Sequence, residues 1–292
     1  MIRILPGLAL GASLFLGGTA VAADDRFADV EIETTNLRGG VHLIAGAGGN
    51  IGVLATPDGL LMVDDQYAPL AERLQAELDA IAPDGPRFVV NTHFHGDHTG
   101  GNPFFGRQGT IISHENVRVR LLDGSEMRAA GLPMITYGDR IRLHMGEETI
   151  DLVHLPDGHT DGDSVVFFRE ADVVHLGDHF FNGRFPFVDR SAGGSVDGLI
   201  ANVTDLLDQL GPDTVIIPGH GPLADPDDLR VYLEMLRETR QTVRDQVAAG
   251  RSDDEILARG LAGRWEDWSW EFITEERWLS TLLAEARSLR GD

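Results

Sequence analysis

The chain has 292 residues and a hydrophobic fraction of 42%, which suit one α/β domain with a sizeable core. Its formal net charge is −23, all 24 of its basic residues are arginine, and it contains no cysteine. The negative charge argues against nucleic acid as a partner, because phosphates require a basic groove. Without thiols, the possible protein metal ligands are His, Asp and Glu.

The first 22 residues have the pattern of a cleavable signal peptide. Arg3 gives the positive start, residues 8–16 form a short apolar run, and residues 20–22 read Ala-Val-Ala, a small-residue cleavage signal. A membrane anchor is the alternative, but the apolar run is shorter than a membrane span requires. We therefore expect a periplasmic or secreted protein without a stable membrane anchor, in which residues 23–292 form a single domain with a helical C-terminal segment.

The N-terminal third is predicted to be mainly β-structure. Gly-rich and Pro-Asp-Gly turns separate three apolar segments, and leucines at 70, 74 and 78 have the spacing of an amphipathic helix. The expected elements are strands at 41–45, 51–55 and 60–63, a helix at 69–81 and a strand at 87–91.

Similar patterns continue along the rest of the chain. We expect strands at 110–113, 140–144, 149–155, 164–168, 172–176 and 214–217, and helices at 115–122 and 195–210. Ser195 suits the N-cap of the last of these helices, and the chain after residue 225 is expected to be mainly helical. Because strands come in blocks that are followed by a helix, two mixed sheets packed face to face, with helices outside, fit best.

Four short segments place His or Asp directly after a predicted strand, in loops rich in Gly or Pro. They contain His93, His95, Asp97 and His98, then His159, then Asp178, and finally His220. A single His or a Gly-Asp turn is weak evidence alone. The cluster at 93–98 is stronger, because burying these groups together without a cation would cost about 2–7 kcal/mol for each group that lacks a partner. It therefore predicts a metal site, and zinc suits these ligands.

The order of these motifs, together with Asp64 after the predicted strand at 60–63, resembles that of the metallo-β-lactamase superfamily of metallohydrolases. The resemblance covers most of the chain, roughly residues 30 to 225. It implies an αββα sandwich of two mixed β-sheets flanked by helices, with two zinc ions at one edge of the sheets. It also implies that Asp64 holds the histidine loop in place behind the ligands.

The resemblance further implies how the ligands are shared. One zinc ion would take His93, His95 and His159, the other would take Asp97, His98 and His220, and Asp178 would bridge the two. Two cations that share one water lower its pKa from 15.7 towards ~7 or below, which makes a nucleophile at neutral pH. Asp97 would have a catalytic role as well, because it is placed to orient the attacking water.

This chemistry predicts a zinc-dependent hydrolase that opens an activated carbonyl in a small molecule. The expected export favours a β-lactam ring as the substrate. However, one large group of lactamases has a cysteine where this chain has Asp178 and an arginine where it has His98, whereas a bridging aspartate is typical of hydroxyacylglutathione hydrolases and lactonases. A lactone or thioester is therefore the alternative substrate. A non-catalytic metal-binding protein is a remote alternative, which the complete set of seven ligands opposes.

The loop after the bridging aspartate contains the predicted substrate-binding residues, Phe181, Asn182 and Arg184. An arginine can grip a carboxylate with two hydrogen bonds, although a surface ion pair is the alternative role for Arg184. The other phenylalanines of this loop either line the cleft or pack in the core. The four tryptophans of the C-terminal segment, at 265, 268, 270 and 278, are expected to pack it onto the body.

Overall fold

The computed structural model describes residues 25–123, 129–261 and 263–289. The predicted signal peptide, residues 1–22, lies outside the described residues. Within the described ranges, no helix is both long enough and apolar enough to cross a bilayer.

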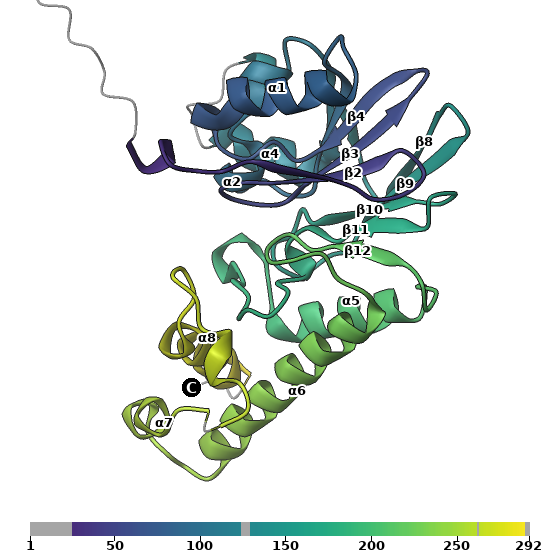
Figure 1. The fold of residues 1–292 in the computed structure, drawn as a ribbon. Coiled ribbons are helices and arrows are strands. Elements are labelled where there is room, and N and C mark those ends of the chain that lie inside the picture. The colour runs from purple at the N-terminus through teal and green to yellow at the C-terminus, as the bar shows by residue number, and fades with distance from the viewer. Residues whose placement is uncertain (1–24, 124–128, 262, 290–292) are drawn as a thin grey trace, which may run out of the picture.

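The first sheet has seven strands in the order β1 to β7 (Figure 1). They are β1 (Glu33–Asn36), β2 (Val41–Ala45), β3 (Ile51–Thr56), β4 (Gly59–Val63), β5 (Pro86–Asn91), β6 (Thr110–His114) and β7 (Ile135–Tyr137). The strands from β1 to β4 pair antiparallel, and those from β4 to β7 pair parallel. The sequence did not predict β1 and β7. All four residues of β1 are exposed and β7 has three residues, so neither shows the alternation that reveals a strand.

The second sheet has five strands in the order β12-β11-β10-β9-β8. They are β8 (Arg140–Met145), β9 (Glu148–His154), β10 (Ser164–Phe168), β11 (Val173–His175) and β12 (Val215–Ile217). Only β11 and β12 pair in parallel among these strands, and α5 lies between them in the sequence. Both sheets are therefore mixed, as predicted.

Helices cover the outer faces of the two sheets and part of one edge of the sandwich. They are α1 (Ala71–Ile81), α2 (Gly96–Thr99), α3 (Asn102–Phe105), α4 (Glu115–Asp123), α5 (Val196–Leu207), α6 (Pro226–Ala248), α7 (Asp253–Arg259) and α8 (Glu275–Ser288). Figure 1 shows α1 above the seven-stranded sheet, α5 below the five-stranded sheet, and α6, α7 and α8 beyond α5. This arrangement confirms the predicted αββα sandwich.

Three apolar clusters fill the layers. Val63, Val90 and Val166 belong to the cluster between the two sheets, and the leucines of α1 pack against the outer face of the first sheet. The helix α1 starts at Ala71, two residues later than predicted, because the preceding residues 68–70 form a 3-10 turn. The third and largest cluster joins the second sheet to α5, α6 and α8.

The C-terminal helices are attached to α5 by polar contacts as well. Glu285 of α8 accepts hydrogen bonds from the backbone N–H groups of Val196 (2.7 Å) and Asp197 (3.1 Å) at the start of α5. A carboxylate is favourable there because the first N–H groups of a helix lack partners within the helix. Ser195 is the N-cap of the same helix, as predicted, and its hydroxyl accepts from the N–H of Gly198.

Candidate metal centre

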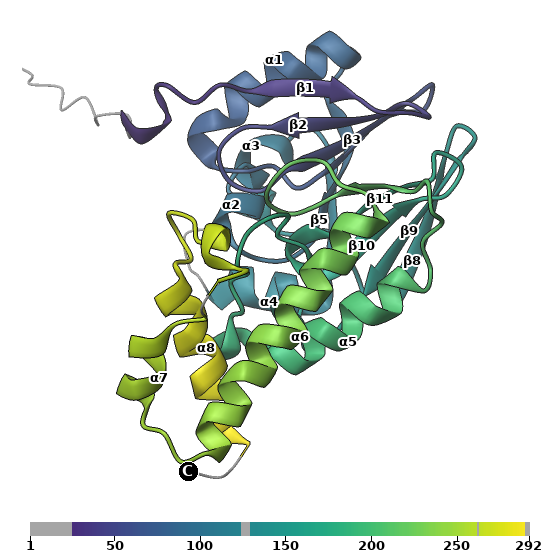
Figure 2. The same cartoon turned by 60° about the horizontal axis from the view of Figure 1, so that its bottom comes forward.

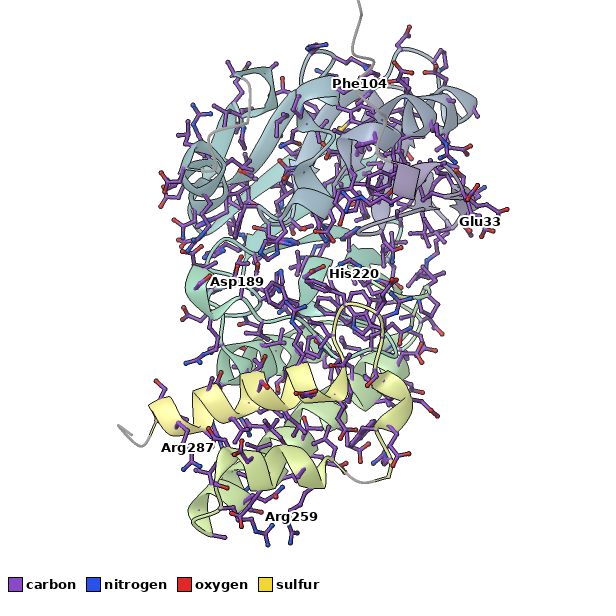
Figure 3. The ribbon with its side chains drawn as sticks, turned by 90° about the vertical axis from the view of Figure 1, so that its left-hand side faces the viewer. Glu33, Phe104, Asp189, His220, Arg259 and Arg287 are labelled. Carbon is purple, nitrogen blue, oxygen red and sulfur yellow. The ribbon has the colours of Figure 1, made fainter. Side chains whose placement is uncertain are left out.

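Loops that follow β5, β9, β11 and β12 bring seven potential ligands to one edge of the sandwich. The side chains are His93 and His95 after β5, Asp97 and His98 in α2, His159 after β9, Asp178 after β11, and His220 after β12. In Figure 3, His220 and Asp189 lie at the level between the sheets and the yellow C-terminal helix α8. The sandwich edge therefore faces the C-terminal segment.

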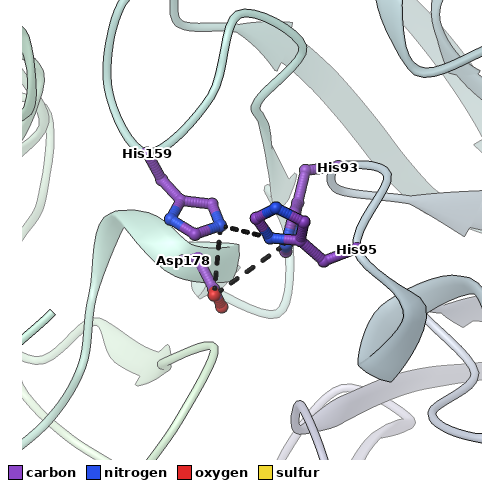
Figure 4. Close-up of side chains that lie close together, drawn as sticks. All are labelled: His93, His95, His159 and Asp178. Carbon is purple, nitrogen blue, oxygen red and sulfur yellow. Dashed lines mark hydrogen bonds and ion pairs between the residues drawn. The ribbon is translucent and has the colours of Figure 1, made fainter. Parts of the chain in front are cut away.

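The first ligand set consists of His93, His95, His159 and Asp178 (Figure 4). Nδ1 of His95 lies 3.1 Å from Nε2 of His93 and 2.9 Å from Nε2 of His159. Oδ2 of Asp178 lies 3.8 Å from Nε2 of His93 and 3.4 Å from Nε2 of His159. Burial lowers the pKa of His159 to about 4, so this imidazole is neutral at pH 7, as a metal ligand must be.

The second set consists of Asp97, His98 and His220, on the other side of Asp178. Nε2 of His98 lies 3.4 Å from Nε2 of His220, and Oδ2 of Asp97 lies 3.6 Å and 3.4 Å from these two atoms. Burial would lower the pKa of both imidazoles, but the carboxylates outweigh it: Asp178 and Asp97 raise the pKa of His220 to about 9 and that of His98 well above its usual value. The carboxylates thus favour a positive charge at this place, and a bound divalent cation would supply that charge instead of protons on the two imidazoles.

The carboxylate of Asp178 faces both sets. Its Oδ2 points to the first set, whereas Oδ1 lies 3.2 Å from Nε2 of His98 and 3.4 Å from Nε2 of His220. Oδ1 is buried and has no hydrogen-bond partner within the described part of the chain, a deficit that a cation would remove. Tetrahedral zinc holds nitrogen ligands about 3.4 Å from one another, and the separations here, from 2.9 to 3.8 Å, fit that size.

Asp64 orients residues of the first loop from behind. Its carboxylate accepts hydrogen bonds from the N–H (2.8 Å) and the hydroxyl (2.7 Å) of Thr92, and its Oδ2 lies 2.8 Å from Nδ1 of His98. This contact leaves the Nε2 atom of His98 facing Asp97 and His220. Asp64 is fully buried and has a φ of 63°, so the turn after β4 fixes the direction of its side chain. The resemblance to the superfamily implied a place behind the ligands for Asp64.

Two further contacts orient histidines and were missed by sequence reasoning. Oδ2 of Asp189 lies 3.1 Å from Nε2 of His95, and the carbonyl oxygen of Phe187 lies 2.7 Å from Nδ1 of His159. Each contact leaves the other ring nitrogen free to face the first set. Asp189 follows no predicted strand and belongs to no motif, so the sequence carried no signal for it.

A cavity of about 500 Å³ opens beside both ligand sets. Its walls are formed by Gly46, Gly48, Tyr67, His95, Gly96, Asp97, Asp178, Phe181, Arg184, Phe187, His220, Trp270 and Phe272. Of the predicted substrate-binding residues, Phe181 and Arg184 line this cavity. Asn182 does not, because its side-chain amide turns away and donates to the carbonyl oxygen of Pro222 (3.1 Å). The prediction for Asn182 is therefore corrected.

Arg184 is half-buried in the cavity wall. None of the ion pairs found among the described residues includes it, and burial lowers the pKa of its guanidinium below the usual value. The guanidinium carbon lies 5.1 Å from the ring centroid of Trp270. The cavity thus holds a positive charge that carboxylates of the described residues do not neutralise by direct contact.

The loop at residues 46–50 contributes Gly46 and Gly48 to the cavity wall and approaches the second set closely. A Cβ atom on Gly49 would lie 2.2 Å from a ring carbon of His98, so only glycine fits there. The side-chain amide of Asn50 donates to the carbonyl oxygens of Pro218 and Gly221, both at 2.9 Å. These bonds tie the loop to the segment that carries His220.

The structure thus has a face-to-face pair of mixed sheets with two groups of histidine and aspartate at one edge, each of which could hold a metal ion. Residues 45–220 match the family model of the metallo-beta-lactamase superfamily. Because the match spans more than half of the chain, this protein belongs to that superfamily. The C-terminal helices lie beyond the matched range.

Similar proteins include more than one kind of hydrolase. The chain is 28% identical over 152 residues to the probable metallo-hydrolase YqgX of Bacillus subtilis, covering 48% of this chain and 71% of that protein. It is 31% identical over 135 residues to the hydroxyacylglutathione hydrolase of Nitrosococcus oceani, covering 45% of this chain and 47% of that protein. The structure of a metallo-beta-lactamase from Pontibacter korlensis matches this one with a TM-score of 0.61 and 18% sequence identity. The match covers 71% of this chain and 99% of that chain, and it shows that the two share a fold.

Proposed function

We propose that this protein is a dinuclear zinc hydrolase whose preferred substrate is a β-lactam. The observation that carries the proposal is that both ligand sets and Arg184 open into one cavity. A β-lactam antibiotic combines an activated carbonyl with a carboxylate, and the cavity offers a place for each. Export directed by residues 1–22, expected from the sequence, would bring the enzyme to the compartment that these molecules reach first.

The ligand residues and the cavity residues have separate tasks in this proposal. Two zinc ions, when bound, would supply an activated water and an electrophile for the carbonyl oxygen. Asp97 lines the cavity, and although burial raises its pKa, His98 and His220 outweigh this effect and lower the pKa to about 2. Asp97 is therefore a carboxylate at neutral pH and can accept a proton or a hydrogen bond from the attacking water.

Arg184 would bind the substrate carboxylate. A guanidinium can donate two parallel hydrogen bonds to a carboxylate, and such charged bonds are stronger in a partly desolvated site. A substrate carboxylate would also supply the counter-charge that the described part of the chain does not provide. The substrate would then be held at one end while its carbonyl faces the ligand sets.

A thioester or a lactone is the second candidate substrate. The aspartate at position 178 and the 31% identity to a hydroxyacylglutathione hydrolase support it. Both reactions would use the same ligand sets, since each attacks an activated carbonyl. A role in metal binding alone has less support, because all seven ligand positions are filled.

A substrate panel tests the proposal. The mature chain, loaded with zinc, is assayed with a chromogenic cephalosporin, an acylated glutathione thioester and an aliphatic lactone. We expect cephalosporin turnover that is lost in His159→Ala and Asp178→Ala. Turnover of the thioester or lactone alone would select the second candidate. A zinc-loaded chain that hydrolyses none of the three would overturn the assignment as a hydrolase of these activated carbonyls.

A further inference from the structure

The segment between α7 and α8 reaches back to the candidate metal centre. Figures 1 and 2 both show it rising from the C-terminal helices toward α2. Trp270 and Phe272 of this segment line the same cavity as Asp97 and Asp178. These two aromatic residues lie outside residues 45–220, the range that matches the superfamily.

Trp270 is held in a fixed position. Its indole N–H donates to the carbonyl oxygen of Phe185 (2.8 Å), and the backbone N–H of Phe185 donates to the carbonyl oxygen of Trp268 (2.9 Å). Its ring centroid lies 5.7 Å from that of His220 and 6.2 Å from that of Phe181. Because these contacts already orient the ring, a ligand that packs on it would have less to order on binding.

Phe272 extends this aromatic wall to the cavity rim. Its ring centroid lies 5.6 Å from that of Trp270 and 5.5 Å from that of Phe187. The guanidinium carbon of Arg277 lies 4.3 Å from the Phe272 centroid and supports the ring. Even so, Phe272 is 47% exposed, so about half of this apolar side chain in the cavity wall is left in contact with water. Covering that surface would be favourable.

We propose that Trp270 and Phe272 select substrates with an aromatic side group close to the carboxylate that Arg184 binds. The proposal rests on the proposed function and narrows its substrate class. The side group would pack against the two rings, and the guanidinium beside Trp270 would hold the acid a short distance away. The substrates are therefore arylalkyl acids that contain an activated carbonyl, rather than purely aliphatic ones.

Binding of two simple acids tests this preference without any turnover. The zinc-loaded chain is titrated calorimetrically with 3-phenylpropanoate and, separately, with propanoate. The two probes share the carboxylate and differ in the phenyl group. We expect the phenyl compound to bind about 10-fold more tightly or better, since a buried apolar group contributes a factor of this order. The ratio of the two dissociation constants removes any common contribution from the metal or from Arg184.

Variants assign the preference to the two rings. Trp270→Ala and Phe272→Ala should each lower the ratio by about threefold or more, and Trp270→Phe, which keeps a ring, should restore most of it. Arg184→Gln should weaken both probes and preserve the ratio. Leu122→Ala is the matched control, because this leucine of α4 is 53% exposed and lies outside the cavity. Because Phe272 is half exposed, its variant tests the proposal even where Trp270→Ala fails to fold.

The outcomes separate this proposal from the proposed function. A ratio near one in the original chain, or a ratio that survives both alanine variants, overturns the aromatic preference. If the zinc-loaded chain hydrolyses none of the three substrates of the panel, the hydrolase assignment is overturned, but the ratio of the two dissociation constants still stands as measured. A high ratio that falls in both alanine variants and not in Leu122→Ala supports the aromatic site, whichever activated carbonyl is hydrolysed.

Discussion

Oδ2 of Asp189 lies 3.1 Å from Nε2 of His95, although the two residues are 94 positions apart. His95 turns its other nitrogen, Nδ1, toward His93 and His159. The contact with Asp189 therefore favours the tautomer whose proton is on Nε2 and whose Nδ1 lone pair is available to a metal ion. The carboxylate stays ionised, because its contacts with Ser191 and His95 outweigh burial and lower its pKa.

Replacing Asp189 should weaken metal binding without unfolding the protein. We expect Asp189→Ala to lower zinc affinity about 10-fold to 100-fold, the usual effect of losing such a partner, and Asp189→Asn to have a smaller effect because its amide oxygen still accepts. Competition with a chromophoric chelator measures the affinity. Equal zinc affinity in the original chain and Asp189→Ala would contradict the role.

The site should hold about two zinc ions per chain. The carboxylate of Asp178 faces both ligand sets, so Asp178→Ala should reduce the zinc content and abolish hydrolysis, and chelation should abolish hydrolysis in the original chain. Elemental analysis after zinc-replete purification measures the content. No more than a trace of metal in that preparation would disprove the dinuclear site.

Arg184 should contribute to substrate binding through charge. With a substrate that carries a carboxylate, we expect Arg184→Gln to raise KM about 10-fold to 100-fold with a smaller change in kcat, because a hydrogen bond to a charged group contributes about 1.5–3 kcal/mol. The methyl ester of the same substrate serves as the control and should show little change. An equal loss for the acid and the ester would instead indicate a general disturbance of the cavity.

A stacked histidine pair away from the ligands should make stability depend on pH. The ring centroids of His114 and His154 lie 3.7 Å apart, and the ring planes are 9° from parallel. Burial lowers the pKa of His114 below 6.5, and the nearby charge of His154 lowers it further. Below pH 6.5 the unfolded chain binds a proton at this position that the folded chain resists, so the free energy of unfolding falls as the pH drops.

Urea denaturation of the metal-free protein at about pH 7.5 and 5.5 measures this dependence. We expect His114→Gln to lose less stability between the two pH values than the original chain does. His144→Gln, at an exposed position of β8, is the control and should retain the original pH dependence. The same slope in all three proteins would refute the assignment to His114.

The contact between α8 and α5 should stabilise the attachment of the C-terminal helices. Glu285 accepts from two backbone N–H groups at the start of α5, and its removal leaves both without this partner. We expect Glu285→Ala to lower the free energy of unfolding by about 1–2 kcal/mol, the cost of losing a helix cap. Denaturant unfolding measures it, with the exposed turn residue Glu147→Ala as the control, which should change stability little.

Long regular elements were predictable from local patterns. The spacing of leucines in α1, the apolar strands of both sheets and the Ser195 cap are each signals within a few neighbouring residues. The short strands β1 and β7 were missed because their positions come from pairing with neighbours and not from their own periodicity. The blocks of strands predicted two mixed sheets with helices outside, the resemblance to a superfamily implied the αββα sandwich, and the layers of the structure agree with both.

The sequence by itself determined which side chains are available as ligands. His93, His95, Asp97 and His98 occur together in one short loop, and burying such groups requires a cation or equivalent partners, whatever the details of the fold. The tertiary structure decided which atom of each ligand faces which set. Asp178 can face both sets only because four strands end at the same edge of the sandwich.

Only the tertiary structure decided the substrate cavity. Asn182 and Arg184 are near neighbours in the sequence, yet one is turned away by Pro222 and the other lines the cavity beside Trp270. The sequence placed Trp270 in a packing role, but the packing of α8 on α6 and α5 brings its segment to the sheet edge. The direction of a side chain depends on contacts between distant segments, and no pattern of neighbouring residues records those contacts.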